Sequence, residues 1–108
     1  MTVFQIVSEF CDRTEVDIHA LVGRCRKEGI VWERFAAMSA CIACGFKSEE
    51  IARFFKRDRT SVIHAKNAWN NLTSANVGNR SSKSRRITEL NKAAIETAEY
   101  FNELEEEE

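Results

Sequence analysis

The sequence predicts an all-α protein: a compact helical domain with a helix-turn-helix, followed by a C-terminal amphipathic helix. Its 108 residues fit a single domain. They include no proline and four glycines, a composition that argues against a β-sandwich with many tight turns. Apolar residues recur at spacings of three and four along most of the chain, which is the period of an α-helix.

Two short helices are expected at the N-terminus. Residues 3–10 carry one apolar stripe, which Asp12 and Thr14 interrupt. We expect Thr14 to cap the second helix, with Asp17 three residues later at the acidic position of a capping box. Gly23 is expected to end that helix.

A short basic loop and a long helix follow. Residues 24–29 form the loop, and its cations are Arg24, Arg26 and Lys27. The helix is expected from about residue 30 to residue 44, and Gly45 ends it. Its core stripe advances by four, three and four residues, through Val31, Phe35, Met38 and Ile42.

The next two helices are expected to form a helix-turn-helix. Ser48 is interpreted as the cap of the first, a short helix that ends at a corner of Lys56 and Arg57. Asp58 is placed to cap the second, which runs from Arg59 to about residue 71. The inner face of this second helix is expected to consist of Val62, Ala65, Trp69 and Leu72.

The C-terminal part is expected to be organised separately from residues 1–73. Residues 74–84 are small and polar and read as a linker, and residues 85–108 as a helix with an acidic tail. The apolar stripe of that helix is formed by Ile87, Leu90, Ala94, Ala98 and Phe101. Because exposing such an apolar stripe to water is unfavourable, the helix is expected to pack on the domain or to pair with a second copy as a homodimer.

Charge is strongly segregated along the chain. The formal net charge is −1, but residues 24–66 carry ten Lys and Arg against five acids. Residues 96–108 carry seven acids and no Lys or Arg. A basic middle between acidic ends indicates a surface that faces a polyanion. A solvated mixed-charge surface is the alternative, and charge alone does not decide between them.

The stretch FFKRDRTSVIHA, residues 54–65, resembles the signature of domain IV, the DNA-binding domain of the bacterial replication initiator DnaA. That signature reads roughly F-G-G-R-D-H-[ST]-T-V-L-H-A. The residues that match it in kind and order are Arg57, Asp58, Thr60, Ser61, Val62, Ile63, His64 and Ala65. The resemblance covers about residues 4–72. It implies a Trp-repressor-like helix-turn-helix that binds double-stranded DNA.

Two departures from the family pattern fall at the corner. Lys56 alone stands for the family's Gly-Gly, and Arg59 stands for its histidine. Both changes touch the edge expected to read bases, so a different target sequence is expected. The 108 residues also contain no GxxxxGK[ST] loop, so they are not expected to act as an ATP-driven initiator.

The candidate DNA-binding residues follow from the geometry of the motif, which places the start of its second helix in the major groove. The expected base readers are Arg57, Asp58, Arg59 and Thr60. Arginine can donate two hydrogen bonds to guanine, aspartate can accept one from cytosine, and a threonine methyl can meet that of thymine. The expected contacts to the DNA backbone come from Arg24, Arg26, Lys27, Arg53, Lys56, Ser61 and Lys66.

Each of these residues also has a plainer interpretation. Asp58 caps a helix in either case, and the arginines at the corner can be solvated charges.

The basic loop is expected to enter the adjacent minor groove, as the family's loop does, because a narrow groove attracts arginine. His64 is interpreted as a structural, hydrogen-bonded side chain, and Trp32 and Trp69 as core or rim residues.

No cofactor, metal or enzymatic activity is expected. Cys41 and Cys44 form a C-x-x-C without the second ligand pair that zinc needs, so Cys44 is interpreted as core and Cys41 as partly exposed. The expected partner is double-stranded DNA, with no membrane and no small-molecule substrate. The expected role is sequence-preferring DNA binding in the cytoplasm, at the nucleoid, by a regulator of replication or transcription or a competitor for initiator sites. The alternative is a protein-interaction module or oligomeric adaptor with weak, non-specific DNA binding.

Overall fold

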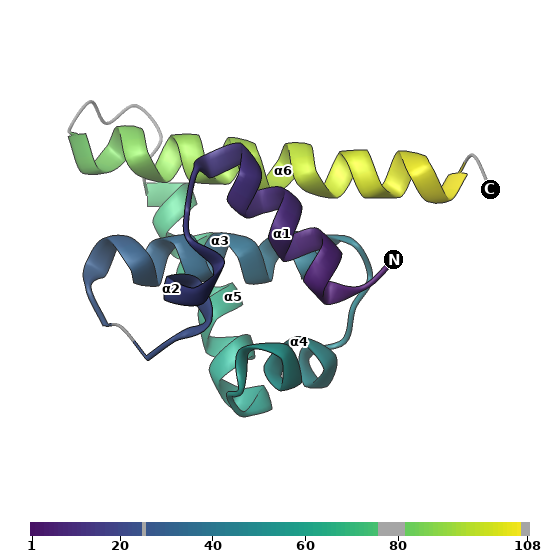
Figure 1. Cartoon of the computed structure of the whole chain (residues 1–108). Helices are drawn as coiled ribbons and strands as arrows, with labels where there is room; N and C mark the ends of the chain where they lie inside the picture. Colours follow the sequence, from purple (N-terminus) through teal and green to yellow (C-terminus); the bar gives the residue numbers. More distant parts are fainter. Residues whose placement is uncertain (25, 76–81, 107–108) are drawn as a thin grey trace.

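The computed structural model describes residues 1–24, 26–75 and 82–106. Over these residues the chain forms six helices and no strand, which confirms the all-α prediction. The helices are α1 (Val3–Thr14), α2 (Ile18–Val22), α3 (Glu28–Ala43), α4 (Ser48–Phe55), α5 (Arg59–Ala75) and α6 (Ser82–Glu106). In Figure 1, α6 lies along one side of the molecule and α4 lies on the opposite side, while α5 runs from beside α4 toward α6, which it contacts. No helix in the described ranges is long and apolar enough to cross a membrane.

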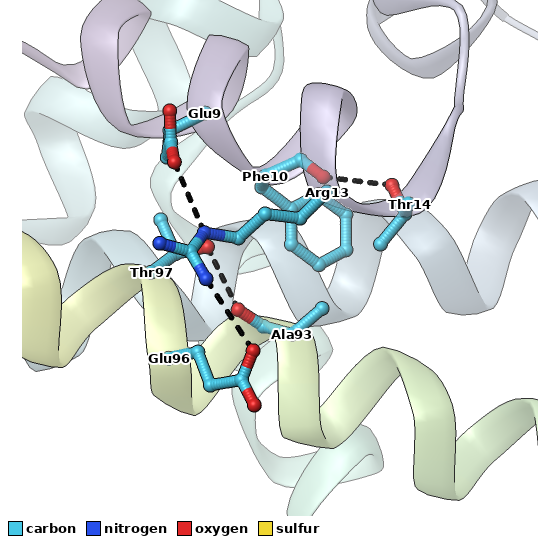
Figure 2. A network of polar contacts seen from close by, with 7 residues as sticks. All are labelled: Glu9, Phe10, Arg13, Thr14, Ala93, Glu96 and Thr97. Atoms are coloured by element: carbon cyan, nitrogen blue, oxygen red, sulfur yellow. Dashed lines mark hydrogen bonds and ion pairs between the residues drawn. The ribbon is translucent and has the colours of Figure 1, made fainter.

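Helix α1 is longer than its apolar stripe predicts. The Thr2 hydroxyl accepts from the Gln5 N–H at 3.1 Å, and the Gln5 side chain accepts from the Thr2 N–H at 2.9 Å, so a capping box starts the helix. The helix continues to Thr14, whose hydroxyl donates to the Phe10 carbonyl at 2.7 Å (Figure 2). The predicted cap of α2 by Thr14 is therefore wrong, because this hydroxyl serves α1.

Asp17 caps α2 in place of Thr14. Its carboxylate accepts from the His19 N–H at 3.0 Å. The helix has five residues and ends at Gly23, as predicted. A helix this short makes few hydrogen bonds of its own, so contacts from other elements must hold it in place.

Helix α3 is the centre of the core and contacts α1, α2, α4, α5 and α6. Of its predicted stripe only Met38 is fully buried, and Val31, Phe35 and Ile42 are half-buried. The fully buried positions are Ala36, Ala37, Met38, Ala40 and Cys41. Because neighbours approach α3 from several sides, its buried surface is wider than one stripe, and small side chains fill most of it.

Helix α6 packs onto this core. Its buried residues are Ser84, Ile87, Leu90, Ala93, Ala94, Thr97 and Ala98, and the helix contacts α1, α3 and α5. At the surface, the Arg13 guanidinium on α1 bridges Glu9 at 3.1 Å and Glu96 of α6 at 3.3 Å (Figure 2). Packing on the domain, one of the two fates expected for this helix, is the arrangement observed.

The predicted linker, residues 74–84, is helical at both ends. Helix α5 extends to Ala75, and α6 begins at Ser82. Residues 76–81 of the linker, and residues 107–108 of the acidic tail, lie outside the described residues.

Candidate nucleic-acid interface

The corner between α4 and α5 is sharp because Lys56 adopts a left-handed backbone conformation, with φ of 55°. The Lys56 N–H then donates to the Arg53 carbonyl at 3.3 Å and the Arg57 N–H to the Ala52 carbonyl at 2.9 Å, which closes α4. At the other end of α4 the cap position is Lys47, with no side-chain hydrogen bond. The predicted cap by Ser48 is therefore wrong.

The conformation of Lys56 makes its replacement by glycine informative. A left-handed conformation costs a residue with a Cβ about 1–2 kcal/mol, and glycine avoids this cost but loses more entropy on folding. We expect Lys56→Gly to leave stability unchanged or raised by up to about 1 kcal/mol in urea denaturation. Lys56→Ala removes the same cation but keeps the strain, so it is the matched control. A marked loss of stability in the glycine variant alone would contradict this account of the corner.

Asp58 caps α5, as predicted. Its carboxylate accepts from the Ser61 N–H at 2.7 Å. Hydrogen bonds from Ser61 hold the pKa of Asp58 below its ordinary value of 3.8. The first turn of α5 therefore has a fixed start.

Replacing this cap is expected to lower the melting temperature. Asp58→Ala removes the acceptor, whereas Asp58→Asn keeps a capping oxygen and is the control. Because the folded-state pKa is depressed, the charged cap contributes its stability above pH 3.8, and this contribution is lost as pH falls through the folded-state value. Melting curves against pH should show this acid-side loss in the wild type and not in Asp58→Asn. Identical acid profiles for the two proteins would contradict it.

The first turns of α5 present a polar edge. Arg59 is exposed and pairs with Glu49 of α4 at 3.6 Å, and Thr60 is exposed beside it. His64, interpreted from the sequence as a structural side chain, lies one turn further and is also exposed. The opposite face of α5 is buried as predicted, through Val62, Ala65 and Trp69. The Trp69 indole N–H has no hydrogen-bond partner among the described residues.

Most residues expected to contact the DNA backbone lie at the protein surface. Arg24, Arg26, Lys27, Arg53, Lys56 and Lys66 are all exposed. Ser61 is half-buried, and its N–H is already used by Asp58. Cys25, inside the basic loop, lies outside the described residues.

A cleft of about 880 Å³ lies between the basic loop and the helix-turn-helix corner. Its cationic lining residues are Arg24, Arg26, Arg34, Lys56 and Arg57. None of the described residues that line it is an acid. A concave surface lined by one sign of charge concentrates the electrostatic potential, which here favours an anion.

Arg57 lines this cleft and is bonded to carbonyls of two other segments. Its guanidinium donates to the Phe55 carbonyl at 2.8 Å, to the Gly23 carbonyl at 2.8 Å and to the Val22 carbonyl at 3.5 Å. Burial, and then the charge of Arg24, lower its pKa from the ordinary value. The interpretation of Arg57 as a base reader stays a prediction, but in this structure both Nη1 and Nη2 donate to carbonyls.

Sequence reasoning assigned no role to Arg34, although it is a buried member of the same site. Arg34 is 6% exposed and donates to the Leu21 carbonyl at 2.8 Å and the Gly23 carbonyl at 3.0 Å. A signal was available, because Arg34 precedes Met38 by four residues and so shares its face of the helix. An arginine on an apolar face indicates a partner within the fold.

The three cysteines that the structure describes are part of the core. Cys11, Cys41 and Cys44 are buried thiols, so the core position of Cys44 is confirmed and the partial exposure predicted for Cys41 is wrong. Burial, followed by nearby carboxylates, raises the pKa of Cys11 to about 11, and burial also raises those of Cys41 and Cys44. No group of three or more metal-ligating side chains occurs within the described ranges.

The family model described as the bacterial DnaA protein helix-turn-helix matches residues 3–68. The chain belongs to this family. The match spans α1 to α4 and the first part of α5, and α6 lies outside it. Comparison with curated proteins and with solved structures gave no match. Membership in this family confirms the resemblance that residues 54–65 show to the DnaA signature. It also supports the binding of double-stranded DNA by this helix-turn-helix.

Proposed function

We propose that the chain binds double-stranded DNA with sequence preference, as a regulator of replication or transcription or a competitor for initiator sites. The first turn of α5 enters the major groove, where Asp58, Arg59 and Thr60 meet base edges. The loop with Arg24 and Arg26 enters the adjacent minor groove. The observation that carries the proposal is the acid-free cationic cleft between these two elements.

In this arrangement the cleft holds one sugar-phosphate strand of the duplex. Adjacent grooves of a duplex are separated by one sugar-phosphate strand. A protein that inserts one element into each groove must therefore seat that strand between them. Arg24, Arg26 and Lys56 line the cleft at this position, and their charges suit phosphates.

We also propose that the chain binds DNA as a monomer. The apolar stripe of α6 that was expected to pair two copies is largely buried within one chain, at Ile87, Leu90 and Ala94. Their burial leaves little of that stripe for a second copy. Sedimentation of the full chain, free and on a duplex, tests this proposal, and a dimer would restore the earlier expectation.

Selection of bound sites from a random duplex pool tests the proposed function. Affinity for the selected site is then measured from about 50 to 200 mM salt. The logarithm of the affinity should fall with the logarithm of salt concentration, by about 0.9 per phosphate contacted. A flat response, or no binding at low salt, would instead favour the protein-interaction module.

Arg59 provides the test of specificity. Arginine is longer than the histidine it replaces and is always charged, which favours guanine or a phosphate. We expect Arg59→His to move the selected site toward the DnaA-type box. Arg85→His is the matched control, because Arg85 is an exposed arginine on α6. If wild type and Arg59→His select the same sites, Arg59 does not read bases.

A further inference from the structure

The end of α2 receives hydrogen bonds from two other elements. The last carbonyls of a helix have no partner within it and carry partial negative charge. Here the Leu21 carbonyl accepts from Arg34, the Val22 carbonyl from Arg57, and the Gly23 carbonyl from both arginines. Cationic donors at a helix C-terminus are favourable for the same electrostatic reason.

The two arginines come from different parts of the fold. Arg34 projects from the central helix α3, and Arg57 is the residue between Lys56 and the cap of the recognition helix. The basic loop begins directly after Gly23. Both the core and the helix-turn-helix corner are therefore bonded to the point where the chain enters the loop.

We propose that Arg57 is a positioning residue that holds the start of the basic loop against the helix-turn-helix corner, and that it does not read a base. This inference rests on the proposed function for its consequence in DNA binding. By these hydrogen bonds Arg57 fixes the separation between α5, which enters the major groove, and the basic loop, which enters the minor groove. A fixed separation lowers the ordering cost of engaging both grooves at once.

The geometry of the Arg57 guanidinium supports this role. Nη1 donates to the Phe55 carbonyl and Nη2 to the Gly23 carbonyl, both at 2.8 Å, so one planar group joins the end of α4 to the end of α2. Nη1 and Nη2 could read guanine together only by leaving these carbonyls. The loss of a charged donor from such acceptors is costly when they are shielded from water.

The charge around Arg57 favours an anion in the cleft. Burial lowers the pKa of Arg57, and the positive charge of Arg24 lowers it further. The fold thus holds two positive groups close together with no acid in the cleft lining. A phosphate strand in the cleft would relieve that repulsion.

Arg57→Lys is the variant that separates positioning from base reading. Lysine keeps the charge, but its single ammonium cannot reproduce the planar guanidinium that joins two carbonyls. Arg59→Lys is the matched control, because it makes the same change at a neighbouring exposed arginine. Urea denaturation of each variant establishes that the global fold is retained.

The first readout needs no DNA. Amide hydrogen exchange is followed at Leu21 and Gly23, whose N–H groups donate to the Asp17 and His19 carbonyls at 3.0 Å. We expect exchange on the order of tenfold faster in Arg57→Lys, relative to the amides of α1, and no change in Arg59→Lys. Unchanged exchange at α2 in Arg57→Lys overturns the proposal whether or not the protein binds DNA.

The second readout is a site selection combined with a double-mutant cycle. We expect Arg57→Lys to retain the wild-type base preference at every position and to bind more weakly. Its effect should also be non-additive with that of Arg24→Ala and Arg26→Ala, because the loop loses its contribution once it is no longer held. A changed base preference, or strict additivity, overturns the proposal. Absence of DNA binding in the wild type would instead refute the proposed function and leave the exchange result to decide the role of Arg57.

Discussion

Replacing Leu90 by alanine is expected to destabilise the protein by about 2–5 kcal/mol. Leu90 is 0% exposed, on a helix that packs against α1 and α3. Its truncation removes apolar contacts and leaves a cavity that the surrounding helices fill only in part. Urea denaturation should show a lower midpoint with an unchanged slope.

The matched control for this substitution lies on the same helix. Ile95 is 50% exposed, so Ile95→Ala should change stability by less than about 0.5 kcal/mol. Equal, small effects of the two substitutions would show that α6 is not part of the core in solution. It would then be the separate C-terminal unit that the polar stretch predicts.

Removing two cations of the basic loop is expected to have the largest effect on DNA binding. Arg24→Ala with Arg26→Ala should reduce the salt slope by about 1.8, because each lost phosphate contact removes about 0.9. The same relation gives a loss of roughly 30-fold in affinity at about 0.15 M salt. Fluorescence anisotropy on the selected duplex across a salt series measures both quantities.

A control with the same change in net charge is available on α6. Arg85 and Lys92 are exposed on this helix, which lies on the opposite side of the molecule from α4 (Figure 1). Their joint replacement by alanine should leave the salt slope unchanged. If both double variants weaken binding equally, net charge governs the affinity and the loop is not a specific contact.

The helix-turn-helix was predictable because its signals are local in the sequence. Asp58 caps α5 through a hydrogen bond to the N–H three residues later, so the residue type and spacing are sufficient to locate it. The buried face of α5 follows from its spacing for the same reason, with Val62, Ala65 and Trp69 all buried. The family signature added the function that such a motif serves.

Positions that depend on several neighbours were predicted less well. Cys41 is buried because α3 is covered from several sides, and a single stripe cannot show this. Thr14 was predicted to cap α2, but the extra turn of α1 occupies its hydroxyl, and Asp17, expected only as the acid of the capping box, caps the helix instead.

The sequence by itself determined the order of the helices, the corner and the segregation of charge, because each depends on residues within a few positions of one another. Only the tertiary structure decided which cations are available to a ligand. Arg57 and Arg59 are two positions apart and look equivalent, yet one guanidinium bonds to the Gly23 carbonyl and the other is exposed at the surface. The difference arises because α2, more than thirty residues earlier in the chain, ends beside the corner with carbonyls that need donors.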